Sequence, residues 1–352
     1  MMKAKSSIFQ IFNNNNTRLC TLLLALILVL GLFIGDRLFS EDGLRSMALQ
    51  LPELGLLSLA MMVPLLSGGI NLSIIATANL SALTIAYVLT LMPIDASNSV
   101  VIFWQLGAVA TGFIVAVIIG LLNGILIGYL RVSPILATLA TMTLVKGLAV
   151  GLSHGTVISG FPSGIVFIGN GSVFGIPMPL ALFIVTAIPM AILLGFTPLG
   201  IKIALFGSNE RAVRFSGINT RKVVVQIYVI SSILAFLAGL LMMARFNSAN
   251  ASYGESYLLV TILACVLGGV HPLGGFGKVS GVVLALIILQ IISTACVVLS
   301  VSQFLTFAIW GGILIAASMY EAASLREFFY YLWRSNSIKP PMPVSSNDNT
   351  TH

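Results

Sequence analysis

Two groups of residues in this sequence have the types and spacing to do chemistry. The first is a set of hydrogen-bonding side chains inside long apolar segments, able to bond a polar solute: Asn71, Ser73, Asn79, Thr138, Thr141 and Lys146. The second is the charged stretch GSNERAVRFSGINTRKV at 207–223, in a chain of which only 8% of the residues are charged. Neither group joins a nucleophile to a base, pairs two carboxylates or gathers metal ligands. The pattern therefore favours binding and contact over catalysis, and it predicts no metal site.

The composition of the chain is that of a membrane protein. Hydrophobic residues make up 58% of the 352 residues, and the mean hydropathy is +1.07. Apolar runs of roughly 20 residues, the length that crosses about 30 Å of hydrocarbon as a helix, recur along almost the whole chain. We expect about ten spans, near residues 19–36, 50–68, 71–93, 101–130, 134–152, 177–195, 223–244, 257–270, 279–299 and 303–320. The sequence thus predicts an all-α, polytopic transmembrane helical bundle whose first span is retained.

The distribution of basic residues predicts the orientation of this bundle. Lys and Arg near span ends are retained on the cytoplasmic side. With the N-terminus inside, thirteen of the 17 Lys and Arg fall on the cytoplasmic side, and only Arg37, Arg45 and Arg245 fall on the other. Both termini are therefore expected in the cytoplasm, and the net charge of +7 needs no nucleic acid partner. The expected parts are a cytoplasmic leader at 1–18, a membrane domain at 19–320 and a cytoplasmic tail at 321–352 with a disordered end.

The polar residues gather around a predicted break in one span. In SGGINLSIIATANLSALT, Gly68 and Gly69 can end a helix and Asn71 can cap the next piece, which predicts a discontinuous span near 68–73 with a polar lining. Such breaks often mark transport paths; the alternative is that these small polar side chains hold neighbouring helices together. Lys146, inside another span, can reach the membrane surface with its long stem, pair with backbone carbonyls near Gly68, or contact a substrate.

The charged stretch falls in the longest cytoplasmic segment between two spans, residues 196–222. Ser208 or Asn209 can cap a short helix, ERAVRFS, with Glu210 near its positive end and Gly217 placed to terminate it. A short helix lying along the membrane surface would let a soluble partner push or pull on the spans. The alternative is an ordinary solvated loop whose Arg residues follow the positive-inside rule.

Four segments, in order along the chain, resemble motifs of one protein family. GGINLS begins at residue 68, SPILATLATMTLVKGLA at 133 and LGGVHPLGGFGKVSG at 267. The charged stretch matches the family's loop pattern at Gly207, Asn209, Ala212, Ser216, Gly217, Ile218 and Asn219. Together they resemble the permease subunits of ribose- and galactose-type ATP-binding-cassette importers, over roughly residues 50–320. One difference is Asn71, where the family usually has an aspartate, so a role of that carboxylate does not carry over.

The resemblance implies a channel subunit that binds no cofactor itself, with ATP used by separate ATPase subunits. The sequence agrees, because it has no Gly-x-x-x-x-Gly-Lys-Ser/Thr phosphate loop. The residues expected to couple the chain to the ATPase are Asn209, Glu210, Arg211, Ala212, Arg214, Phe215, Gly217 and Asn219. The glycines expected to shape the turns are Gly68, Gly69, Gly268, Gly269, Gly274 and Gly275. Further partners implied are a second copy or a paralogue of the chain, a periplasmic solute-binding protein and the lipid of a bacterial cytoplasmic membrane.

The substrate expected from the resemblance is a simple sugar, which suits a lining of Asn, Ser and Thr. Nucleosides, autoinducer-like sugars and branched-chain amino acids are the alternatives within the same architecture. An ion-coupled secondary carrier is an alternative of another class. It is disfavoured because such carriers commonly use carboxylates inside the membrane, whereas all ten Asp and Glu residues are expected in loops or near span ends.

Overall fold

The computed structural model describes residues 15–93, 97–302, 304–317 and 319. Most of the predicted leader and all of the predicted tail, 321–352, lie outside these residues. Within them the chain is almost entirely helical, because helices alone satisfy their own backbone polar groups in hydrocarbon.

The described helices follow one another with short connections. In chain order they are α2 (Asn15–Leu38), α3 (Glu41–Leu66), α4 (Ile74–Thr90), α5 (Asn98–Gly128), α6 (Pro134–Ser153), α7 (Ser163–Asn170), α8 (Met178–Phe196), α9 (Pro198–Ser208), α10 (Glu210–Phe215), α11 (Thr220–Phe246), α12 (Tyr257–Leu267), α13 (Val279–Val298) and a last helix, Phe304–Ala317. Four two-residue strands, β1 (Ile158–Ser159), β2 (Ser172–Val173), β3 (Ile176–Pro177) and β4 (Ser248–Ala249), form two antiparallel pairs, β1 with β4 and β2 with β3.

The predicted all-α membrane bundle is confirmed. Each predicted span coincides with a helix, and seven of the helices in the described residues are long and apolar enough to cross a membrane. The helices of the three remaining predicted spans, α4, α12 and Phe304–Ala317, are shorter, with 10–17 residues. The predicted break near 68–73 is also confirmed, because α3 ends at Leu66 and α4 begins at Ile74. The exact count of ten spans stays a prediction.

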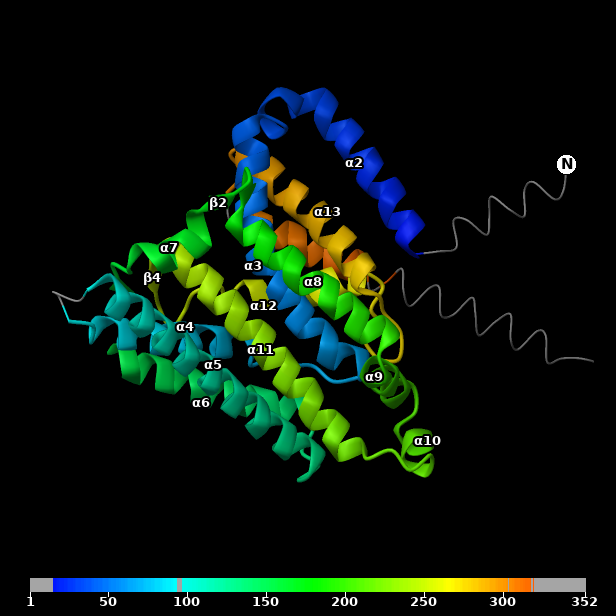
Figure 1. Cartoon of the computed structure of the whole chain (residues 1–352). Coiled ribbons are helices and arrows are strands. Elements are labelled where there is room, and N and C mark those ends of the chain that lie inside the picture. The colour runs from blue at the N-terminus through cyan, green and yellow to red at the C-terminus, as the bar shows by residue number, and fades with distance from the viewer. Residues whose placement is uncertain (1–14, 94–96, 303, 318, 320–352) are drawn as a thin grey trace, which may run out of the picture.

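Helices α3 and α11 form the centre of the bundle. Their apolar windows are 83% and 78% buried, against 6% for α2, which packs mainly on α13. Helices α4, α5 and α6 lie on one side of α11, and α3, α8 and α13 on the other (Figure 1). Close approach to α11 depends on small residues: a Cβ added at Gly120 or Gly124 of α5 would lie within 3.0 Å of the backbone of α11. This packing makes α11 a central element that contacts both groups of helices.

The connections gather at two opposite ends of the bundle. At one end β1 pairs with β4, with Ile158 opposite Ala249. At the other end the break at 67–73, the α8–α11 connection and the turn at 268–278 meet, and Gly275 N donates to Leu66 O at 2.8 Å. We call the end that holds α10 the inner end and the opposite one the outer end. The described basic residues at the inner end are Arg18, Arg131, Lys202, Arg211, Arg214, Arg221, Lys222 and Lys278. They are among the residues from which the cytoplasmic side was predicted, and the orientation stays a prediction.

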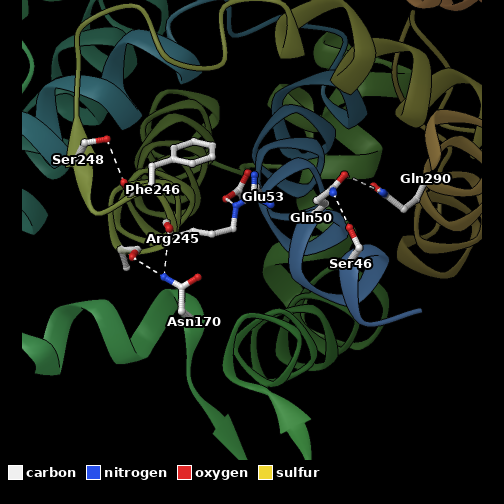
Figure 2. A network of polar contacts seen from close by, with 9 residues as sticks. Ser46, Gln50, Glu53, Asn170, Arg245, Phe246, Ser248 and Gln290 are labelled. Carbon is white, nitrogen blue, oxygen red and sulfur yellow. Dashed lines mark hydrogen bonds and ion pairs between the residues drawn. The ribbon is translucent and has the colours of Figure 1, made fainter. Parts of the chain in front are cut away.

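A buried ion pair at the outer end joins α3 to α11 (Figure 2). Arg245 Nε lies 2.6 Å from Glu53 Oε1, and the Glu53 side chain is fully buried. Asn170, the last residue of α7, donates its amide to the carbonyls of Ala244 and Arg245 at 3.2 and 3.1 Å. Glu53 lies within α3 but at the level of the last turn of α11, near the outer end of the bundle, so it does not contradict the prediction that every carboxylate lies in a loop or near a span end. It can be held there because Arg245 balances its charge.

The outer segment between α6 and α8 is more ordered than a surface loop. It contains α7 and the β2–β3 hairpin, whose turn residues Phe174 and Gly175 both have positive φ, 51° and 81°. Phe174 is fully exposed. The sequence analysis did not predict these elements, because their apolar runs are too short to show a helical or strand period.

Candidate functional site

The charged stretch at the inner end folds as predicted. The side chain of Asn209 accepts a hydrogen bond from Ala212 N at 3.0 Å and so caps α10. Gly217, with φ of +77°, turns the chain after α10, and Asn219 caps α11 by accepting from Lys222 N at 3.2 Å. These caps fix α10 as a separate short helix directly before α11.

Helix α10 exposes almost all of its surface. Only Val213 is buried, at 4% exposure, whereas Phe215 is 92% exposed. Glu210, Arg211 and Arg214 are also exposed. A large aromatic side chain so exposed beside charged groups is the usual composition of an interface centre with a polar rim.

Helix α9, which the sequence analysis did not predict, joins α10 to the bundle. Thr197 caps it by accepting from Gly200 N at 3.3 Å, and Pro198 occupies its first position. The Thr-Pro pair was the available signal, but it lay within a segment read as a connection. Through α9, α10 is attached to the ends of α8 and α3.

Three segments of the inner end meet backbone to backbone at four glycines, Gly68, Gly207, Gly274 and Gly275. We call this contact the glycine junction. A Cβ at Gly207 would overlap Leu66 O, and one at Gly274 would lie 2.5 Å from Gly68 N. Gly68, Gly274 and Gly275 also have positive φ, between 78° and 89°. The junction joins α9 to the end of α3 without intervening side chains, so a displacement of α10 and α9 reaches the break directly.

Replacing a junction glycine tests this close packing. Gly274→Ala is expected to cost about 1–2 kcal/mol for its left-handed backbone and roughly a further 1–3 kcal/mol for overlap with Gly68. The matched control is Gly155→Ala, since Gly155 also has positive φ, +72°, but an added Cβ there meets nothing within 4 Å. Thermal unfolding of the detergent-purified variants compares the two; equal losses would contradict the proposed packing.

The predicted glycines at 268 and 269 shape the end of α12. An added Cβ at Gly268 would lie 2.7 Å from Val282 of α13, and Gly269 has φ of +80°. Gly69 faces the Tyr228 hydroxyl, which would lie 2.8 Å from an added Cβ. Five of the six predicted glycines therefore lie at close backbone contacts, at positive φ, or at both, and Gly69 lies against the side chain of Tyr228.

A cavity of about 710 Å³ lies between the break and α10. Its lining includes Ser67, Gly68 and Gly69 from the break and Glu210, Arg211 and Arg214 from the α10 helix. Tyr228 of α11 also lines it, and among the described residues its buried hydroxyl has no hydrogen-bond partner. Tyr228 was not among the predicted path residues, although a tyrosine in an apolar span was a usable signal. Helix α10 and the break thus face the same space.

Asn71 is the centre of a buried hydrogen-bond network at the break. Its Nδ2 donates to Ser231 Oγ at 2.9 Å, and its Oδ1 accepts from Ser73 N and Ser73 Oγ at 3.1 and 2.7 Å. Ser73 Oγ in turn accepts from Asn123 Nδ2 at 2.9 Å, and Ser231 Oγ donates to Ala60 O at 2.7 Å. The network joins the break to α3, α5 and α11.

Truncating Asn71 is expected to destabilise the fold, because its partners would be left buried without hydrogen bonds. Asn71→Ala should cost about 1–3 kcal/mol for the unmade bonds. Asn250→Ala is the matched control, since Asn250 Oδ1 makes the same local bond, to Ser252 N at 2.8 Å, in an exposed turn. Chemical or thermal unfolding of both variants measures the difference, and a loss for Asn71→Ala no larger than for Asn250→Ala would refute the role of the network.

Most of the predicted path residues are buried against other helices. Asn71, Ser73 and Thr138 are 0% exposed, Thr141 2% and Asn79 4%. Thr138 donates to Ile70 O and Pro134 O at 3.2 and 2.8 Å. This placement favours the alternative in which small polar side chains hold helices together; their part in translocation stays a prediction.

Lys146 is the exception, because its side chain is 46% exposed. The interpretation that it pairs with carbonyls near Gly68 is wrong. Lys146 Nζ lies 2.7 Å from Glu255 Oε1, in the segment between β4 and α12 at the outer end. The sequence analysis did not name Glu255, because nothing in the sequence brings these distant segments together.

Comparison with known proteins decides the family. Residues 43–320 match the family model described as branched-chain amino acid transport system / permease component. The chain belongs to this permease family. The matched region begins in the first turn of α3 and extends past the last described helix, so it includes α10, the glycine junction and the break.

Several curated permeases are similar to this chain over most of their length. It is 31% identical over 295 residues to the L-arabinose transport system permease protein AraH of Escherichia coli (strain K12), covering 82% of this chain and 87% of AraH. It is 31% identical over 279 residues to the ribose import permease protein RbsC of Bacillus subtilis (strain 168), covering 76% of this chain and 80% of RbsC. The autoinducer 2 import system permease protein LsrD of Salmonella typhi is 30% identical to this chain over 324 residues, covering 90% of this chain and 94% of LsrD. No solved structure matches the chain.

Proposed function

We propose that this permease is the membrane subunit of an ATP-binding-cassette importer, located in the bacterial cytoplasmic membrane. It translocates a simple sugar, delivered by a periplasmic binding protein and driven by separate ATPase subunits. The observation that carries the proposal is the exposed, capped helix α10, attached through α9 and the glycine junction to the break between α3 and α4.

The mechanism follows from these attachments. An ATPase that binds Phe215 and the charged residues of α10 would move α10 as a rigid unit. The caps at Asn209 and Asn219 make α10 a helix separate from α9 and α11. That displacement acts on the cavity that α10 and the break both line. The permease is then a two-state element whose equilibrium is set by contacts with its partner. The chain itself holds no nucleotide, and a second copy or a paralogue would complete the path.

The substrate class is supported by the named relatives, which import arabinose, ribose and autoinducer 2. The family description names branched-chain amino acids, and these form the competing substrate class. The outer segment with α7 and the β2–β3 hairpin is the surface we expect to meet the binding protein.

The proposal is tested with the complex reconstituted in sealed vesicles, from the permease, its ATPase and its binding protein. Labelled L-arabinose, D-ribose, L-leucine and adenosine are supplied in turn. We expect ATP-dependent uptake of a sugar and none of leucine or adenosine. Uptake of leucine alone would overturn the substrate class, and uptake that needs neither ATP nor ATPase would overturn the importer.

A further inference from the structure

The Lys146–Glu255 ion pair occupies an unusual place for charged side chains. Lys146 lies roughly 18 Å along α6 from its first residue, at 1.5 Å per residue, and so well inside this helix of 20 residues. Both side chains are about half exposed, at 46% and 50%. Charged groups are disfavoured against hydrocarbon and usually face the bundle interior or a water-filled space. The side of α6 that carries Lys146 is therefore expected to face water or a polar partner instead of lipid.

A cavity of about 170 Å³ adjoins the pair. Its polar lining comes from Asn79 on α4, Lys146 on α6 and Glu255 before α12, and its apolar lining includes Ile75, Met142 and Leu258. Three segments far apart in the sequence thus converge on one small space. Its apolar side and its polar groups are the usual composition of a small-molecule site.

Asn79 leaves one polar atom available to this cavity. Its Nδ2 donates to Ala251 O and Tyr253 O, both at 2.9 Å, which fixes the orientation of the amide. Within the described part of the chain, its Oδ1 accepts no hydrogen bond. The cavity therefore offers a carboxylate and an amide oxygen as acceptors and an ammonium group as donor.

Resting on the proposed function, we infer that Asn79, Lys146 and Glu255 form a recognition site for a neutral polyhydroxylated solute on its way through the permease. A hydroxyl group both donates and accepts, so a sugar can bond all three groups while the ion pair stays closed. Its C–H face would lie against Ile75, Met142 and Leu258. A zwitterionic amino acid would instead have to separate Lys146 from Glu255 to satisfy its own charges, which disfavours that class.

The experiment uses the full complex in sealed vesicles, with labelled L-arabinose and D-ribose as probes. The quantity measured is sugar imported per ATP hydrolysed. Lys146→Met and Glu255→Gln are each expected to lower this ratio about tenfold, the usual effect of losing one charge-assisted hydrogen bond, while the ATPase rate stimulated by the loaded binding protein is unchanged. Arg37→Met is the matched control, since it removes an exposed basic residue from α2, away from the cavity, and should leave the ratio as it is. Lys146→Arg replaces Lys146→Met if that variant is not recovered, and should lower the ratio less.

The charge exchange Lys146→Glu with Glu255→Lys separates recognition from structure. It keeps an ion pair but moves the donor and the acceptors, so the ratio is expected to stay low. A return to the wild-type ratio would show that the pair only holds α6 to the outer segment, and wild-type ratios in the single variants would equally overturn the inference. Labelled L-leucine is supplied to the wild type as a third probe, and import of leucine in place of sugar would show that the ligand class is wrong. If it shows no ATP-dependent import of either sugar, the proposed function fails and the inference falls with it.

Discussion

Reversing the charges on α10, as Glu210→Arg with Arg211→Glu, is expected to abolish ATP-driven uptake and association with the ATPase while the chain still inserts and folds. Both side chains are exposed, and the cap that forms α10 comes from Asn209 and is untouched. The cost to the fold is limited to the helix-end effect of the exchanged charges, about 0.3–1 kcal/mol. The effect on a charge-complementary interface is larger, because like charges would then meet.

The matched control for this variant is the exchange Asp36→Arg with Arg37→Asp. These residues are also adjacent, opposite in charge and exposed, but they lie near the outer end of α2. Co-purification of the ATPase and uptake into vesicles measure both variants. Normal uptake by the α10 variant, or equal losses in the two exchanges, would reject the assignment of α10 as the coupling helix.

Removing the cation from the buried pair, as Arg245→Met, is expected to be the most destabilising single change at the outer end. Glu53 is fully buried and its ion-pair partner in the described residues is Arg245, so the variant would leave an uncompensated charge between α3 and α11. Breaking such a pair on one side typically costs about 3–5 kcal/mol. Thermal unfolding of the purified protein should show the loss.

The double variant Glu53→Gln with Arg245→Met tests whether the unpaired charge of Glu53 causes the loss of stability in Arg245→Met. Without either charge, most of the lost stability is expected to return, since replacing a whole buried pair is often close to neutral. Arg45→Met is the control, because Arg45 lies on the same outer end of α3 but is exposed. A double variant no more stable than Arg245→Met alone would mean that the arginine acts through packing and not through its charge.

The parts of the fold that sequence could predict are those set by local chemistry. Apolar runs of membrane length gave the positions of the helices, and the glycines at 68 and 69 gave the break. The cap of α10 was narrowed to Ser208 or Asn209, because a side-chain oxygen that bonds two or three residues ahead needs no tertiary context, and the structure uses Asn209. The helix α9 was missed because its Thr197–Pro198 start lay in a segment read as a charged connection.

The parts that sequence could not predict depend on which face of each helix meets a neighbour. In a membrane protein both the lipid-facing and the buried faces are apolar, so the helical period that marks the core of a soluble protein is largely lost. The burial of Asn71 and Thr138 between helices could for that reason not be predicted, and their part in a translocation path stays a prediction. The pairing of Glu53 with Arg245, and of Lys146 with Glu255, depends on contacts between distant segments that no local pattern encodes.

The central claim is that this permease has no energy source of its own and is moved by an ATPase acting on α10. The most direct measurement is sugar accumulation in sealed vesicles that contain the purified chain, with and without the ATPase and the binding protein. The account predicts accumulation against a gradient only when ATP and both partners are present. Accumulation by the chain alone would contradict it.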